Sequence, residues 1–146
     1  MPLLAKDALK ETLGGVLGTR GRTESQLLGV AVFELLGVLL RELLSSGVSL
    51  IVEGNFARGS PAMAELPPAR IAQVHVSAPP GLLRERLLER DAHRHPVHYD
   101  REAADEIMDR ATRGEWLPLD LAGALIQVDT STTVDVAPIV AELRRL

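Results

Sequence analysis

The chain of 146 residues has no cysteine, few aromatic residues and only two lysines, Lys6 and Lys10. Without cysteine there is no disulfide framework, no thiolate nucleophile and no cysteine-ligated metal site. Because aromatic residues make up only 3% of the chain, we expect Leu, Val and Ala to form the core, within a hydrophobic fraction of 46%. The sequence also contains no Gly-x-Ser-x-Gly motif, so a serine hydrolase is not expected.

Charge and hydropathy exclude further classes of protein. The net charge of −4 argues against a nucleic-acid-binding protein, which usually carries a basic surface. The first residues place Lys6 and Asp7 after a short apolar stretch, which is not a signal peptide. The apolar segment 27–40 is shorter than the roughly 20 residues that a bilayer requires. We therefore predict a soluble, cytoplasmic protein with no membrane association.

Short apolar strand-like segments alternate with helical segments along the chain. This alternation predicts an α/β fold, a parallel sheet flanked by helices, in one domain covering residues 1–146. The long helix is expected to begin with a capping box at Thr23–Gln26 and to be buried on most sides. The predicted strands are 2–5, 50–52, 71–76 and 124–128, and the predicted helices are 8–17, 24–46, 82–92, 101–113 and 136–146.

Polar residues follow the predicted strands, where ligands of parallel sheets bind. Asp7 follows the first strand and is a helix N-cap, a general base or anchor for a substrate hydroxyl, or both at once. Glu53 and Asn55 follow the second strand. Glu53 either faces a wet cleft, near substrate or Mg²⁺-bound water, or caps the following loop. Arg58 is either an anion ligand or a solvated surface residue.

The segment from Arg90 to Asp100, RDAHRHPVHYD, concentrates arginine and histidine side chains around Pro96. Guanidinium and imidazole groups donate hydrogen bonds to phosphate oxygens. Proline interrupts a helix, so we expect these donors to lie on a mobile loop over an anionic ligand rather than on a packed surface. Arg90 and Arg94 are the strongest phosphate-binding candidates. The histidine spacing matches no known zinc pattern, so no metal ligands are predicted.

The ordered motifs KDALKE, LIVEGNF, LLRERLLER, RHPVHYD and VDTS resemble those of the P-loop kinase superfamily. The resemblance is to small AAA-type ATP-dependent kinases related to chloramphenicol phosphotransferase and zeta-toxin kinases. It implies ATP and Mg²⁺ as cofactors, a small-molecule acceptor as partner, and a lid at about 90–113. It also implies that Asp7 activates the acceptor hydroxyl, that Arg90 and Arg94 stabilise charge, and that Glu53 lies near Mg²⁺ or substrate. Thr130 and Ser131 match the loop that passes the adenine.

The chain departs from that family because it has no G-x-x-x-x-G-K-[S/T] motif, the loop that cradles phosphates. The family's first strand lies in the middle of the sheet, so the strands ending at Glu53 and Ser77 lack a neighbour. Three outcomes are open. The two strands pair directly, another chain fills the gap, as in a homodimer formed by strand exchange, or the sequence is a truncated version of a longer protein.

Three classes of function follow from these observations. The first is phosphoryl transfer from ATP to a small-molecule hydroxyl in a full-length parent, with this chain inactive or impaired. The second is a non-catalytic remnant or interaction module that does not bind ATP. The third is a sulfotransferase-like or nucleotide-binding regulatory protein, which shares the same order of strands and helices.

Overall fold

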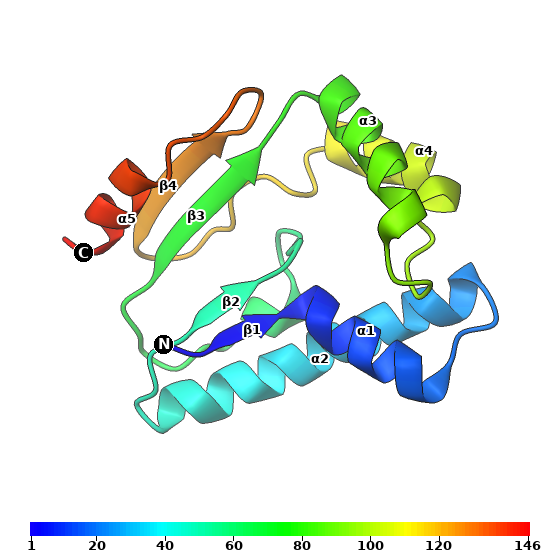
Figure 1. Ribbon diagram of the computed structural model, residues 1–146. Helices are drawn as coiled ribbons and strands as arrows, with labels where there is room; N and C mark the ends of the chain where they lie inside the picture. The colour runs from blue at the N-terminus through cyan, green and yellow to red at the C-terminus, as the bar shows by residue number, and fades with distance from the viewer.

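The computed structural model describes residues 1–146, in which strands and helices alternate as predicted (Figure 1). Each predicted element is present, with its ends shifted by a few residues. In chain order the elements are β1 (Leu3–Ala5), α1 (Lys6–Leu17), α2 (Arg22–Ser45), β2 (Ile51–Glu53), η1 (Pro61–Met63), β3 (Ala72–Ser77), α3 (Pro80–Arg90), η2 (Asp91–His93), α4 (Asp100–Thr112), β4 (Ala124–Asp129) and α5 (Ala137–Leu143).

The strands form two separate parallel pairs rather than one sheet. β1 pairs with β2, with Leu3 opposite Ile51, and β3 pairs with β4, with Ala72 opposite Ala124. No strand pairing joins β2 to β3, although these strands face each other across the middle of the molecule in Figure 1. The alternative that the strands ending at Glu53 and Ser77 pair directly is therefore wrong for this structure.

Four of the five α-helices form two groups on either side of the molecule, and α5 lies near β4 (Figure 1). α2 packs against α1 and η1 and runs beneath the β1–β2 pair, whereas α3 packs against α4 (Figure 1). The chain between α3 and α4 returns toward α1 and closes one side of the molecule. The carboxyl ends of β1 and β2 point toward this closed side, which positions the candidate site.

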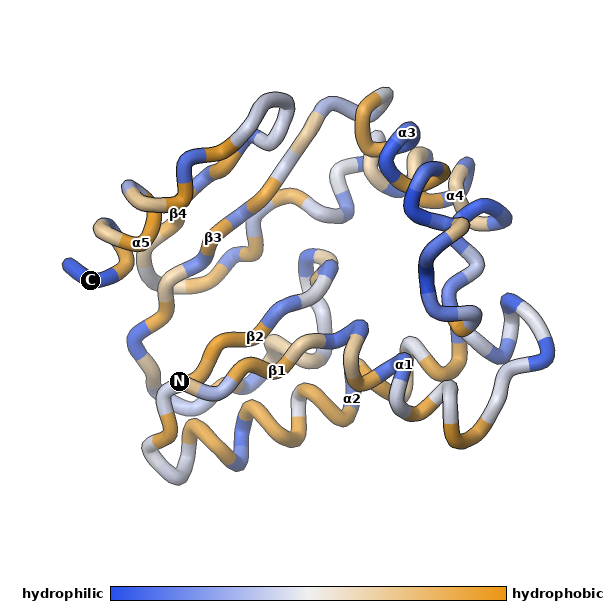
Figure 2. The backbone as a smooth tube through the Cα atoms, viewed as in Figure 1, coloured by the Kyte–Doolittle hydropathy of each residue, from blue (hydrophilic) through white to orange (hydrophobic).

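Helix α2 differs from its prediction in two ways. It begins at Arg22 with Gly21 as its N-cap and has no side-chain cap, so the predicted capping box is wrong. Its apolar residues extend around the helix (Figure 2), but only one face is covered. Leu36 is fully buried, whereas Leu27 is 66% exposed and Val30 is 60% exposed. Burial on most sides is wrong because nothing in this chain packs on the outer face.

The core is small for a chain of this length. Only 14 of 146 residues are buried, and the accessible surface is 9449 Å². A compact monomer of 15.8 kDa is expected to expose about 7,300 Å², from the relation 6.3 M^0.73. The exposed apolar residues include Ile51 on β2 and Val76 on β3. These two strands do not pair with each other, and no other strand pairs with both of them. None of the helices combines the length and the apolar character that a membrane crossing requires.

Candidate functional site

A pocket of about 480 Å³ lies where the carboxyl ends of β1 and β2 meet the α3–α4 pair and the segment that joins those helices. Four acidic residues line it, Asp7, Glu53, Asp100 and Glu106, against seven basic ones. The excess of positive charge contrasts with the net charge of −4 of the whole chain and favours an anionic ligand. The basic residues are Lys6, Lys10, Arg22, Arg86, Arg90, Arg94 and Arg110.

Asp7 lies in the first turn of α1, directly after β1, and its carboxylate is held by two cations. Lys6 Nζ donates to Asp7 Oδ1 at 2.7 Å, and Arg94 forms an ion pair with Asp7 Oδ2. The N-cap position belongs to Ala5, so the interpretation of Asp7 as the helix cap is wrong. Burial alone raises the pKa of Asp7, but the hydrogen bond from Lys6 and the charges of Lys6 and Arg94 lower it overall.

Arg90 and Arg94, on either side of η2, both reach Asp100 at the start of α4. Arg90 Nε donates to Asp100 Oδ2 at 3.0 Å, and Arg94 Nη1 lies 3.3 Å from the same oxygen. Because Arg94 also pairs with Asp7, a continuous network of charges joins α1 to the segment between α3 and α4. The structure thus brings the sequence candidates Asp7, Arg90 and Arg94 together.

The loop 94–98 is packed against α1 and α2 rather than standing free as a mobile cover. Val97 is 2% exposed and lies against Gly14 of α1. Ser25 Oγ donates to the Val97 carbonyl at 2.5 Å, and Lys10 Nζ donates to Ser25 Oγ at 2.8 Å. Burial, followed by the nearby charge of Lys6, lowers the pKa of Lys10. The prediction of an unpacked loop is wrong because Pro96 ends the helix without preventing docking of the residues that follow.

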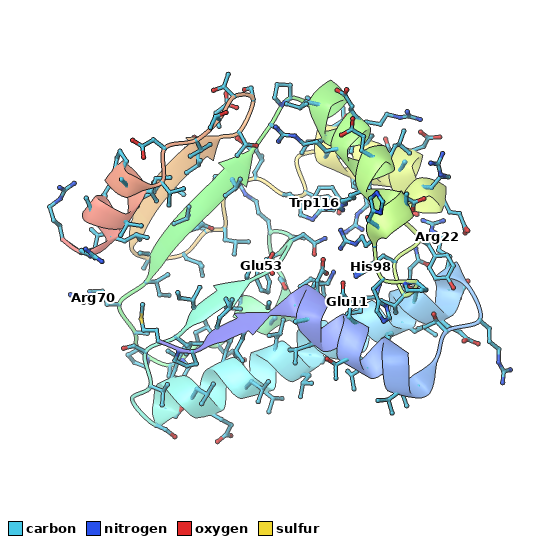
Figure 3. The ribbon with its side chains drawn as sticks, viewed as in Figure 1. Glu11, Arg22, Glu53, Arg70, His98 and Trp116 are labelled. Atoms are coloured by element: carbon cyan, nitrogen blue, oxygen red, sulfur yellow. The ribbon has the colours of Figure 1, made fainter.

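His98 provides a further contact between this loop and α1 (Figure 3). Its side chain is 5% exposed, and Nε2 lies 3.0 Å from Glu11 Oε1. Burial lowers the pKa of His98, and the nearby Arg94 guanidinium lowers it further. His98 is therefore neutral at pH 7, and its contact with Glu11 is a hydrogen bond in which the ring nitrogen donates.

The remaining sequence candidates fall into two groups. Glu53 and Asn55, after β2, line the same pocket as Asp7. Arg58 lies apart from them, because its Nε donates to the Pro118 carbonyl at 2.9 Å and it lines a different cavity. Thr130 and Ser131, after β4, also lie outside the pocket. Thr130 accepts a hydrogen bond from the pocket residue Arg86, and Ser131 donates to Asp129.

Three buried side-chain donors have no hydrogen-bond partner: Arg22 Nε, Arg94 Nε and Trp116 Nε1. All three residues line this one pocket. A buried donor without an acceptor is costly, so oxygen atoms of a ligand would stabilise the site. Sequence reasoning missed Arg22 and Trp116, as well as Lys10 and Ser25. Only the position of Lys10, one turn after Lys6 on the same helix face, offered a signal.

No group of three or more histidine, aspartate or glutamate side chains is arranged to hold a metal ion. Anion recognition by guanidinium, ammonium and indole donors is the chemistry that the pocket offers.

This fold and this pocket define a kinase-like α/β protein. The chain is 33% identical to a putative kinase from Chloroflexus aurantiacus J-10-fl of known structure, with a TM-score of 0.85. The match covers 99% of this chain and 83% of that one, and the chain belongs to the same family as that protein. No family model and no curated protein matches the sequence.

Proposed function

We propose that this chain is the acceptor and lid portion of a P-loop-type kinase that transfers a phosphoryl group from ATP to a hydroxyl of a small molecule. The observation that carries this proposal is the pairing of Asp7 with Arg94 inside a predominantly basic pocket at the carboxyl ends of the strands. Phosphoryl transfer needs a carboxylate that orients the acceptor hydroxyl. It also needs guanidinium groups nearby that neutralise the charge of the phosphate.

Asp7 orients the acceptor hydroxyl by accepting its hydrogen bond. Because the pKa of Asp7 is lowered, the carboxylate is ionised at neutral pH. Arg94, which pairs directly with Asp7, and Arg90 neutralise phosphate charge beside this carboxylate. Both arginines are paired with carboxylates, so an incoming phosphate competes with Asp7 and Asp100 for their donors.

The residues present fit the outer phosphate oxygens of ATP, since Arg94 holds a buried Nε without a partner. When bound, Mg·ATP supplies the phosphoryl group and the metal charge. The phosphate cradle is not among these 146 residues, because no G-x-x-x-x-G-K-[S/T] motif is present. Arg86 connects the pocket to Thr130, which favours an adenine position near Thr130 and Ser131.

The separation of the two strand pairs supports the proposal that a central strand is missing between them. In parallel sheets neighbouring strands lie about 4.8 Å apart, so an unpaired strand edge inside a protein leaves its backbone groups unsatisfied. The unpaired edges of β2 and β3 and the large accessible surface favour one more strand between them. That strand would lead into the phosphate cradle beside Asp7 and Arg94.

The test uses an extended chain, in which a strand, a G-x-x-x-x-G-K-[S/T] loop and a helix precede residue 1. Transfer of labelled γ-phosphate from ATP to a panel of hydroxylated compounds is the measurement. We expect Asp7→Asn and Arg94→Gln to reduce transfer by about 100-fold or more, as for loss of a catalytic positioning group. Arg20→Gln, outside the pocket, is the matched control. Transfer that is insensitive to Asp7→Asn and Arg94→Gln would contradict the assignment.

A non-catalytic interaction module is the second candidate function. The observation in its favour is that Arg90 and Arg94 are already neutralised by Asp7 and Asp100. In this case another chain, or a second copy in a homodimer, occupies the space between β2 and β3. An extended chain that folds but neither binds nor hydrolyses Mg·ATP would favour this module over the kinase.

A further inference from the structure

Trp116 lies in the turn after α4, and its side chain faces the inside of the molecule between β3 and the α3–α4 pair (Figure 3). His75 Nε2 of β3 lies 2.8 Å from the Trp116 carbonyl oxygen and fixes the backbone. The guanidinium carbon of Arg110 lies 4.9 Å from the centre of the indole ring and fixes the ring by a cation–π contact. These two contacts restrain the backbone and the ring of Trp116.

The indole Nε1 is buried and has no acceptor in the protein. Buried indole N–H groups normally find a partner, because an unsatisfied donor loses its hydrogen bond to water without replacement. Trp116 contributes to the wall of the same pocket as Asp7 and Glu53. The neighbouring Arg110 guanidinium is paired with Glu115 at 2.7 Å, so it is the excess of basic side chains around the pocket that favours an oxygen with negative charge as the acceptor.

Arg22 contributes a second donor of this kind from the start of α2. Its Nη2 pairs with Glu106 of α4, while its Nε is buried without a partner. If Arg90 and Arg94 serve the transferred phosphate, Arg22 and Trp116 remain for the acceptor molecule. Both residues line the pocket, Arg22 from α2 and Trp116 from the turn after α4.

Resting on the proposed function, we infer that Trp116 is a specificity-determining residue whose Nε1–H donates to an oxyanion of the phosphoryl acceptor. The acceptor is accordingly a small hydroxylated anion that carries either a carboxylate or a phosphate ester. Its hydroxyl meets Asp7, and its anionic group meets Trp116. An uncharged polyol lacks the group that this donor recognises.

The test is a binding measurement on the 146-residue chain without ATP. Three probes with the same carbon skeleton are compared: glycerate as carboxylate, glycerol 3-phosphate as phosphate ester, and glycerol as the uncharged match. Trp116 is the only tryptophan, so its fluorescence reports directly on this site, and calorimetry in Tris–chloride measures affinity. We expect at least one anion to bind about tenfold or more tightly than glycerol, since hydrogen bonds to charged groups are the stronger ones.

Variants then locate the contact. Trp116→Phe keeps an aromatic ring but removes the donor, and it should weaken anion binding about tenfold while leaving glycerol binding unchanged. Arg22→Gln should act in the same direction, and Arg20→Gln, which lies outside the pocket, should have no effect. Melting curves by circular dichroism verify that each variant is folded. Preference for one anion identifies the acceptor as a carboxylate or as a phosphate ester.

Three results would overturn the inference: glycerol binding as tightly as the anions, no probe binding at all, or full anion affinity in both Trp116→Phe and Arg22→Gln. Failure of the proposed function is distinguishable from these. Anion binding that depends on Trp116, combined with no phosphoryl transfer by the extended chain, contradicts the kinase proposal alone. Transfer to an uncharged acceptor without anion binding contradicts this inference alone.

Discussion

The segment 90–100 and the facing edges of β2 and β3 differ in whether their groups find partners within this chain. In the segment, Arg94, Val97 and His98 each have a partner on α1 or α2. At the strand edges, the backbone groups of β2 and β3 do not pair with each other, and Val76 is 60% exposed. The polar contacts of the segment are thus made within this chain, whereas β2 and β3 belong to two separate strand pairs. The comparison is the basis of the proposal that a further segment completes the sheet.

The largest expected effect contrasts the two faces of α2. Leu36→Ala, on the buried face, should lower the free energy of unfolding by about 2–5 kcal/mol, because it leaves a cavity in a small core. Leu27→Ala, on the exposed face, should change it by less than about 0.5 kcal/mol. Urea unfolding of both variants is the measurement. An equal loss at Leu27 would mean that the outer face is covered in solution, for instance by a second copy.

Neighbouring glycines on α1 test the docking of the loop. A Cβ at Gly14 would lie 2.5 Å from Val97 Cγ2, whereas a Cβ at Gly15 would meet nothing within 4 Å. Gly14→Ala should therefore destabilise the protein by about 1–3 kcal/mol, as overpacking does. Gly15→Ala should stabilise it by about 0.5–1 kcal/mol, because alanine is the better helix former. Thermal melts of the two variants measure the difference, and the same sign for both would contradict the packed loop.

Substitution of Ser25 tests the hydrogen bonds that hold the loop 94–98 against α1 and α2. Ser25→Ala removes the hydroxyl between Lys10 and the Val97 carbonyl and leaves both buried groups without this partner. We expect a loss of about 1–3 kcal/mol. Hydrogen exchange should also become faster in residues 94–98. Ser46→Ala, at the exposed end of α2, is the control, and unchanged exchange in the loop of Ser25→Ala would show that Ser25 does not anchor it.

The smallest expected effect is a pH dependence that arises from His98. Its pKa in the folded protein lies below the ordinary value of 6.5, so the unfolded chain takes up the proton first as the pH falls. The stabilising contribution is complete above pH 6.5 and is lost as the pH falls toward the folded pKa. His98→Gln should remove this component. Melting temperatures of both proteins between about pH 7.5 and about pH 5 measure it, and parallel curves would contradict the assignment.

The sequence predicts local structure better than it predicts contacts. Alternating apolar segments locate every strand and every α-helix, although not the short 3-10 helices η1 and η2, since periodicity and helix-breaking residues act locally. The carboxyl-end rule likewise predicts that Asp7 and Glu53 lie at one edge. The partners of Ser25 and Trp116 were not predictable, because they lie 72 and 41 residues away along the chain, at Val97 and His75. Burial of α2 was overestimated, since its apolar pattern does not reveal whether this chain provides the covering segment.

Calorimetric titration with Mg·ATP, applied to the 146-residue chain and to the extended chain, tests the central claim most directly. A basic pocket without its phosphate cradle should bind Mg·ATP only with a Kd of about 1 mM or weaker, whereas the extended chain should reach the order of 10 μM. Arg94→Gln should weaken binding in the extended chain. Micromolar binding by the 146 residues alone, or no binding by a folded extended chain, would contradict a lid and acceptor site that needs one more strand.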